Sequence, residues 1–301
     1  MASGHSCYRP VLPNGRYIGC APKADNNICG GSLLTLSIVQ TACHCIARFL
    51  WNANNLFSET VAKSVWEDIY EIYPGITPVK SVKKALARTY ITHPKCKGIS
   101  GTNIVYHDFG LIVLLKPAQA RGIRTAPVYT ITTLTSIWTE LMAKKSVCLN
   151  VGFGGYKLTK DNQTDRSAPP DLMHGWVLAM NRLECYEYSR LAWRYEDATF
   201  FCTKVLPTFN QRTGIGDSGT PVSCDNQYSG ISSTSIITSK YFLNLFTISM
   251  STAFTIFENS AEYRESLILL TQSFSKYDPK AKVFLYRPTA PKINQYLICC
   301  E

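Results

Sequence analysis

The chain has 301 residues, enough for one large domain or two small ones, and its 46% hydrophobic and 17% charged residues are ordinary for a globular protein. Its formal net charge of +10 favours acidic partners, but the one compact basic run is at residues 80–88 (KSVKKALAR), which argues against nucleic-acid binding. No stretch approaches the ~18 consecutive apolar residues of a membrane-spanning helix, so a membrane span is excluded.

The twelve cysteines are a high number for a cytosolic enzyme. Their spacings lack the paired Cys-x-x-Cys units that a structural zinc site needs. Disulfides persist in oxidising compartments, which predicts a secreted or extracellular protein. Residues 1–14 (MASGHSCYRPVLPN) contain no apolar core of a secretory signal, so no signal peptide is visible in this chain.

Short apolar runs separated by turn residues recur along the chain. They lie at residues 32–41, 88–92, 109–115, 147–152 and 241–250. Their length and β-branched content predict an all-β fold made of many short strands. No repeat period indicates a solenoid or a propeller.

Two long segments between these runs, residues 51–78 and 157–175, are predicted to be surface loops. The first lies next to the His44 strand, and we expect it to govern substrate access. The second carries the only N-glycosylation sequon, at Asn162.

One helix is predicted near the end of the chain. Asn259 and Glu262 have the spacing of a capping box and precede apolar residues at helical intervals, which indicates a helix at about residues 260–272. Residues 273–301 follow it as a C-terminal extension.

Three residues have the chemistry of an acyl-transfer site, which needs a nucleophile, a base and a carboxylate that orients the base. His44 ends an apolar strand (CGGSLLTLSIVQTACHC), and Asp108 directly precedes another (HDFGLIVLL). Ser218 stands in RTGIGDSGTPVSC, where flanking glycines permit a tight turn that exposes its hydroxyl.

These segments resemble the chymotrypsin and trypsin family of serine endopeptidases over roughly residues 1–270. CGGSLL and TACHC are similar to the family's CGGSL and TAAHC, HDFGLIVL to its NDIALIKL, and GDSGTP to its GDSGGP. ITHPKC is similar to the family's His-Pro segment, and the order His, Asp, Ser is also the same.

The resemblance implies a fold of two six-stranded antiparallel β-barrels. They would occupy roughly residues 1–127 and 128–256 and, with the helix at 260–272, form a protease domain of residues 1–272.

The resemblance also implies a role for each site residue. His44 would be the general base and then the general acid, Asp108 would orient its imidazole, and Ser218 would form the acyl-enzyme. The backbone N–H groups of Gly216 and Ser218 would form the oxyanion hole. Ser233 matches the family's serine that supports the buried aspartate.

Three disulfides are implied by the resemblance: Cys29–Cys45, Cys148–Cys224 and Cys185–Cys202. Because the triad and the bridges account for the His and Cys positions, no metal and no cofactor is implied. The pairing of the other six cysteines stays open: Cys7, Cys20, Cys43, Cys96, Cys299 and Cys300.

The substrate pocket departs from the family pattern. We expect Arg212, Thr213, Ser233 and Ser235 to line it. The family's cysteine four residues before the nucleophile is here Gly214, so the bridge that braces the pocket is missing. Arg212 occupies the floor position, which disfavours Arg or Lys side chains of a substrate. It would pair with an acidic substrate side chain, or else it would fill the pocket or turn to solvent because the loop is not braced.

Activation in the family inserts a new N-terminal ammonium beside the aspartate before the nucleophile, here Asp217. Residues 1–4 stand near the expected distance before Cys29 and could provide that terminus. If Met1 is instead an initiator, the buried Asp217 lacks its partner and the oxyanion hole is poorly formed.

We therefore predict a secreted serine endopeptidase that hydrolyses peptide bonds through a His/Asp/Ser triad and an acyl-enzyme. Its partners would be protein or peptide substrates and a protein inhibitor, with no nucleic acid and no membrane span. The alternative is a catalytically silent homologue that acts as a binding or regulatory protein.

Overall fold

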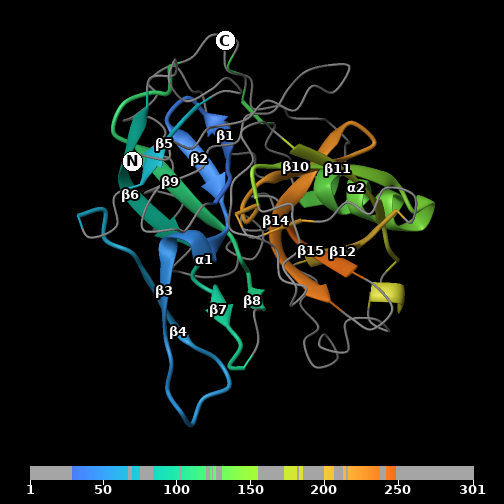
Figure 1. Ribbon diagram of the computed structural model, residues 1–301, viewed down its shortest axis with the longest axis horizontal. Helices are drawn as coiled ribbons and strands as arrows, with labels where there is room; N and C mark the ends of the chain where they lie inside the picture. The colour runs from blue at the N-terminus through green and yellow to red at the C-terminus, as the bar shows by residue number, and fades with distance from the viewer. Residues whose placement is uncertain are drawn as a thin grey trace, which may run out of the picture.

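Two antiparallel β-sheets contain most of the strands in the computed structural model of the protein (Figure 1). The predicted helix at 260–272, the C-terminal extension 273–301 and the sequon at Asn162 lie outside the part of the chain that the structure describes. That part comprises residues 29–66, 70–74, 84–101, 104–119, 123, 125–126, 131–154, 173–181, 183–185, 200–206, 213–214, 216–237 and 242–248.

The first sheet has the strand order β1-β2-β9-β6-β5. All five residues of β9 (GLIVL) are buried, because this strand pairs with β2 on one side and β6 on the other. The apolar run predicted at residues 109–115 therefore includes a central strand. The strands are β1 (Ser32–Thr35), β2 (Ile38–Thr41), β5 (Glu71–Ile72), β6 (Ala85–Thr92) and β9 (Gly110–Leu114).

The second sheet closes into a barrel with the order β10-β11-β12-β15-β14-β13. Closure leaves this sheet without a free edge strand. Its interior is filled by apolar side chains, among them Val177, Phe201 and Val222. The strands are β10 (Val147–Gly152), β11 (Met173–Ala179), β12 (Phe200–Val205), β13 (Pro221–Cys224), β14 (Gln227–Ile237) and β15 (Phe242–Ile248).

The predicted all-β fold with two curled antiparallel sheets is confirmed, and the second sheet has the expected six strands. Within the described residues the first sheet has five strands instead of six. The boundaries predicted for the domains stay a prediction. No helix in the described part of the chain has the length and apolar content needed to cross a membrane.

Helix α2 (Ile131–Lys144) was not expected from the sequence. Its side chains at Ile137 and Leu141 lie one turn apart and pack in the core of the closed barrel. The β-branched residues of its first turns (ITTLTSI) are weak helix formers, which conceals this spacing.

Two short hairpins extend from the first sheet beside the one-turn helix α1 (Cys43–Ile46) (Figure 1). They are β3–β4, formed by Ala47–Leu50 and Glu59–Ala62, and β7–β8, formed by Lys97–Gly98 and Val105–Tyr106. The prediction of a loop over residues 51–78 is thus wrong at β4 and at β5, which pair with the neighbouring strands β3 and β6.

The two sheets share one apolar core. Leu33 and Ile112 of the first sheet belong to the same buried cluster as Val151 of the barrel. The hydroxyl of Tyr228 in β14 also donates a 2.9 Å hydrogen bond to the Gln40 side-chain oxygen in β2. This shared core fixes the turns that meet between the sheets, and those turns carry the candidate site.

Candidate active site

His44 and Asp108 meet through two hydrogen bonds. His44 lies in α1, and Asp108 lies directly before β9. The backbone N–H of His44 donates to Asp108 Oδ1 at 2.9 Å, and His44 Nδ1 lies 2.7 Å from Asp108 Oδ2. The carboxylate therefore fixes the ring's orientation and favours the tautomer with the proton on Nδ1, which leaves Nε2 as the acceptor.

A third group completes the environment of this carboxylate. The Ser233 hydroxyl in β14 donates to Asp108 Oδ2 at 2.5 Å. The Asp108 side chain is fully buried, whereas 28% of the His44 side-chain surface is exposed. A buried charge with three hydrogen bonds thus faces a base that solvent can reach.

Opposing effects act on the pKa of His44. Burial lowers it, but the charge of Asp108 and the hydrogen bond to Asp108 raise it, so the pKa lies above its ordinary value of 6.5. The nearby charge of Lys63 opposes this rise. Asp108 therefore stabilises the imidazolium, which is the form that a general base acquires when it takes a proton.

Ser218 lies on the turn before β13 and is held against the His44 segment. Its carbonyl oxygen accepts a 2.6 Å hydrogen bond from the Gly30 N–H and lies 3.8 Å from Cys45 Sγ. Within the described residues, no hydrogen bond joins the Ser218 hydroxyl to the His44 ring. The two side chains are both half-exposed and come from facing segments.

Close backbone packing explains two of the glycines in these motifs. A Cβ atom at Gly219, where φ is +81°, would lie 2.4 Å from the Gly30 carbonyl oxygen and 2.8 Å from the Ala42 nitrogen. A Cβ atom at Gly30 would lie 2.1 Å from Thr220 Cγ2. The segments CGGS and GDSG can approach each other only because both positions lack a side chain.

The Asp217 carboxylate is closely surrounded by the glycine residues Gly152, Gly154 and Gly214. Its carboxylate accepts 2.8 Å hydrogen bonds from the N–H groups of Gly154 and Gly214. A Cβ atom at Gly152 would lie only 1.6 Å from Asp217 Oδ1. Burial raises the pKa of Asp217 to about 6, although the two N–H groups act in the opposite direction.

Within the described residues, the two N–H groups assigned to the oxyanion hole have no competing acceptor. Neither Gly216 N–H nor Ser218 N–H donates a hydrogen bond within the described part of the chain. Gly216 has a φ of +104°, a conformation that a residue with a side chain rarely adopts. The neighbouring amides of Asp217, Gly219 and Thr220 are in contrast all used within the fold.

The expected substrate pocket is described in part. Thr213 is buried, and the Ser233 hydroxyl contacts Asp108, as its likeness to the family's supporting serine implies. Ser235 lies in β14, and Arg212 lies outside the described residues, as does the side chain of Ser235. The pocket assignment therefore stays a prediction.

The described residues contain four disulfides. Three are the pairs that the resemblance implies, Cys29–Cys45, Cys148–Cys224 and Cys185–Cys202. The fourth, Cys43–Cys96, joins two cysteines whose pairing the sequence left open. His44 thus stands between two bridged cysteines.

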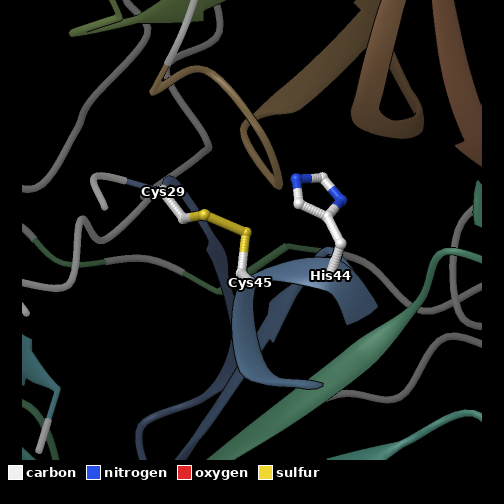
Figure 2. A group of neighbouring side chains, drawn as sticks. All are labelled: Cys29, His44 and Cys45. Atoms are coloured by element: carbon white, nitrogen blue, oxygen red, sulfur yellow. A yellow bond between two sulfur atoms is a disulfide. The ribbon is translucent and has the colours of Figure 1, made fainter. Parts of the chain in front are cut away.

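The sulfur atoms of Cys29 and Cys45 and a ring nitrogen of His44 lie within 4.8 Å of one another (Figure 2). Three such atoms have the composition of a metal site. The two sulfurs, however, are bonded to each other and offer no thiolate, which is the form that binds metal. The Cys29–Cys45 disulfide therefore has a structural role: it links the two segments covalently beside His44.

Several contacts that shape the site were not predicted from the sequence. Gly154 and Gly214 bind the Asp217 carboxylate, and Cys96 fixes the residue before His44. The clustered glycines in VGFGG and RTGIGDSG were the available signal for the first two. A partner for Cys43 carried no such signal, since six cysteines were equally open.

Comparisons with known proteins agree with this geometry. The family model described as trypsin matches residues 16–247. Among solved structures, the chain is similar to neuropsin, a serine protease expressed in the limbic system of mouse brain. The TM-score is 0.54 with 18% sequence identity, and the match covers 80% of this chain and 92% of that one. This likeness shows the fold alone. No curated protein sequence matches the chain.

Proposed function

Because a family model covers most of its length, this chain belongs to the trypsin family, and we propose that it is a serine endopeptidase. The observation that carries the proposal is the hydrogen-bonded chain from Ser233 through Asp108 to the His44 ring. This series of hydrogen bonds ends at the half-exposed imidazole of His44, which faces the segment carrying Ser218.

His44 acts as the proton carrier in the proposed mechanism. Its Nε2 takes the proton of the Ser218 hydroxyl as the oxygen attacks the substrate carbonyl. The resulting imidazolium is stabilised by Asp108 and then protonates the leaving amine. A water molecule, deprotonated by the same imidazole, hydrolyses the acyl-enzyme.

Gly216 and Ser218 stabilise the oxyanion through their backbone N–H groups. Support comes from the absence of any competing acceptor for these two groups within the described residues. An N-terminal ammonium beside Asp217 is our proposal for the partner that keeps this turn in its active conformation. Burial raises the pKa of the Asp217 carboxyl, and an ammonium placed beside it would favour the ionised form and offset that effect.

Protein or peptide substrates and an extracellular setting complete the proposal. Four disulfides in the described part of the chain favour an oxidising compartment. A protein inhibitor that binds at the same site is a further proposed partner.

One observation favours the alternative of a silent homologue that binds without cleaving. It is the missing hydrogen bond between the Ser218 hydroxyl and the His44 ring among the described residues. In unliganded proteases this contact is often long and tightens only when substrate is bound. A chemical test of Ser218 reactivity therefore distinguishes the two functions.

The test is reaction of the oxidised protein with a fluorophosphonate, followed by measurement of its intact mass. We expect one adduct in the wild type and none in Ser218→Ala, since only an activated serine beside formed oxyanion donors reacts. The variant Ser223→Ala, in β13, serves as a control that must still form the adduct.

Absence of an adduct in the wild type would contradict the proposal for this form of the chain. Sequencing the N-terminus of protein from its natural source would then distinguish an inactive precursor from a silent homologue.

A further inference from the structure

The hairpins β3–β4 and β7–β8, together called the arm, are joined into one unit. Phe57 and Ile99 form an antiparallel bridge between them. The Ser58 N–H donates to the Gly98 carbonyl at 3.1 Å, and the Gly98 N–H donates back to the Ser58 hydroxyl at 2.9 Å. The Trp51 ring packs so closely on Gly98 that a Cβ atom there would lie 2.8 Å from it. The relative position of the two hairpins is therefore fixed.

A groove of about 440 Å³ lies in the arm. Residues 55–60 line one part of it, and Pro94, Cys96 and Lys97 line another. Its volume falls in the range of sites that bind small ligands, which is enough room for a few side chains of a bound segment. Leu56, which is 53% exposed, and the half-buried Phe57 give the groove an apolar wall beside polar groups.

The charges at the groove favour an acidic occupant. Lys95 and Lys97 are both exposed, and neither forms an ion pair within the described part of the chain. Glu59 is the one acidic residue among those that line the groove. The chain as a whole carries a net charge of +10. An approaching acidic segment would be attracted to this face, where Leu56 and Phe57 offer apolar surface in the same groove that Lys97 lines.

The groove is covalently connected to helix α1, which carries His44. Cys96, which lines the groove, is bonded to Cys43, the residue before His44. Thr60 Oγ1 in β4 also donates a 2.5 Å hydrogen bond to the Cys96 carbonyl. Because these links hold the groove at a fixed place relative to His44, a segment bound there keeps the rest of its chain near Ser218 at a high effective concentration.

We propose that the arm groove binds an extended segment of the protein substrate that carries acidic and apolar side chains, at a site separate from the bond to be cleaved. The substrate role rests on the proposed function, whereas the binding itself does not. Such a contact is made equally before and during the reaction, so it lowers KM and leaves kcat unchanged.

Binding is tested by fluorescence polarisation with a short fluorescein-labelled peptide of alternating Glu and Leu residues, on protein carrying Ser218→Ala to prevent cleavage. We expect the double variant Lys95→Glu/Lys97→Glu to weaken binding by about tenfold or more, because two attractive charges become repulsive. Leu56→Asn should also weaken it. The matched controls are Lys116→Glu/Lys144→Glu and Leu183→Asn, which change exposed residues away from the groove and should bind as before.

Equal binding by the Lys95→Glu/Lys97→Glu variant and its control would overturn the groove proposal. Fluorophosphonate labelling of the same variants with Ser218 intact reports separately on the proposed function. Labelling without groove-dependent binding leaves the protease proposal standing and removes the groove. Groove-dependent binding without labelling overturns the assignment of the bound segment to a substrate.

Discussion

The two carboxylates of the candidate site are held by different kinds of contact. Asp108 accepts hydrogen bonds from the His44 ring, from a serine hydroxyl and from one backbone N–H. Asp217 accepts hydrogen bonds from the backbone N–H groups of two glycines. The base is therefore positioned by side-chain chemistry, and the nucleophile turn is positioned by the path of the backbone.

This difference determines which substitutions damage each half. A side-chain network fails when a donor or a charge is removed, even if the shape is kept. A backbone network fails when a side chain is added where none fits, even if no functional group is lost. Single substitutions can therefore disturb one half at a time.

The largest effect is expected from Asp108→Asn. The amide keeps the shape of the carboxylate but presents an N–H₂ group to His44 or Ser233, which favours the wrong imidazole tautomer and removes the charge. We expect kcat to fall by roughly 10³- to 10⁴-fold. Steady-state hydrolysis of a peptide ester measures this loss, and an unchanged thermal transition would show that the fold is retained. A fall of less than about tenfold would mean that His44 does not depend on Asp108.

Gly219→Ala tests the backbone half. The added Cβ would meet the Gly30 carbonyl oxygen at 2.4 Å at a position where φ is +81°, so the turn that carries Ser218 must shift. A displacement of about 1 Å at a reacting group can cost ~10²-fold, and we expect kcat/KM to fall by about that factor. Fluorophosphonate labelling rates give the same readout without a substrate.

Gly101→Ala is the matched control for this change. Gly101 also has a positive φ, +73°, but an added Cβ there meets nothing within 4 Å. Both variants carry the cost of the left-handed backbone, and only Gly219→Ala adds the clash. Equal losses of labelling rate in the two variants would contradict the role given to close packing.

Ser233→Ala should have a smaller effect on the side-chain half. It removes one hydrogen bond to the buried Asp108 carboxylate while leaving the bonds from His44 in place. A hydrogen bond to a charged group contributes about 1.5–3 kcal/mol, so we expect kcat/KM to fall by roughly ten- to a hundredfold. Ser232→Ala, a change at a buried serine beside it, is the control and should retain activity. Equal activity of both variants would argue that Asp108 needs no third donor.

The same contrast explains what the sequence could predict. His44, Asp108 and Ser218 stand in motifs whose residue types carry the chemistry, so they could be named before the fold was known. The glycines that enclose Asp217 act through space that only packing reveals. The Cys43–Cys96 bridge depends on where the arm returns to α1, which no local pattern encodes.

Helix α2 shows the limit of local propensity. Its first turns favour extended structure, and packing of Leu141 into the barrel core decides the outcome. The sequence predicted that the first sheet is antiparallel but not that it has five strands. Short strands such as β5 have too few residues to show the alternation that would identify them.

The smallest expected effect is a shift in the titration of His44. In the wild type its pKa lies above 6.5 because the charge of Asp108 and their hydrogen bond outweigh burial. In Asp108→Asn burial remains without that charge, so we expect the pKa to fall below 6.5. Histidine NMR signals recorded against pH measure both values, with Ser218→Ala used in each protein to prevent self-cleavage.

The sign of the linked stability follows from the same shift. A raised pKa means that the folded protein holds the His44 proton more tightly than the unfolded chain does. The resulting contribution to stability is full below pH 6.5 and is lost as the pH rises through the pKa of the folded state. In Asp108→Asn the sign reverses, and charging His44 on acidification should destabilise the fold. Asp217 also titrates with a shifted pKa, but it does so in both proteins, so the difference between their denaturation midpoints isolates His44. A difference that does not grow in favour of the wild type as the pH is lowered would contradict a dominant role for Asp108 at this histidine.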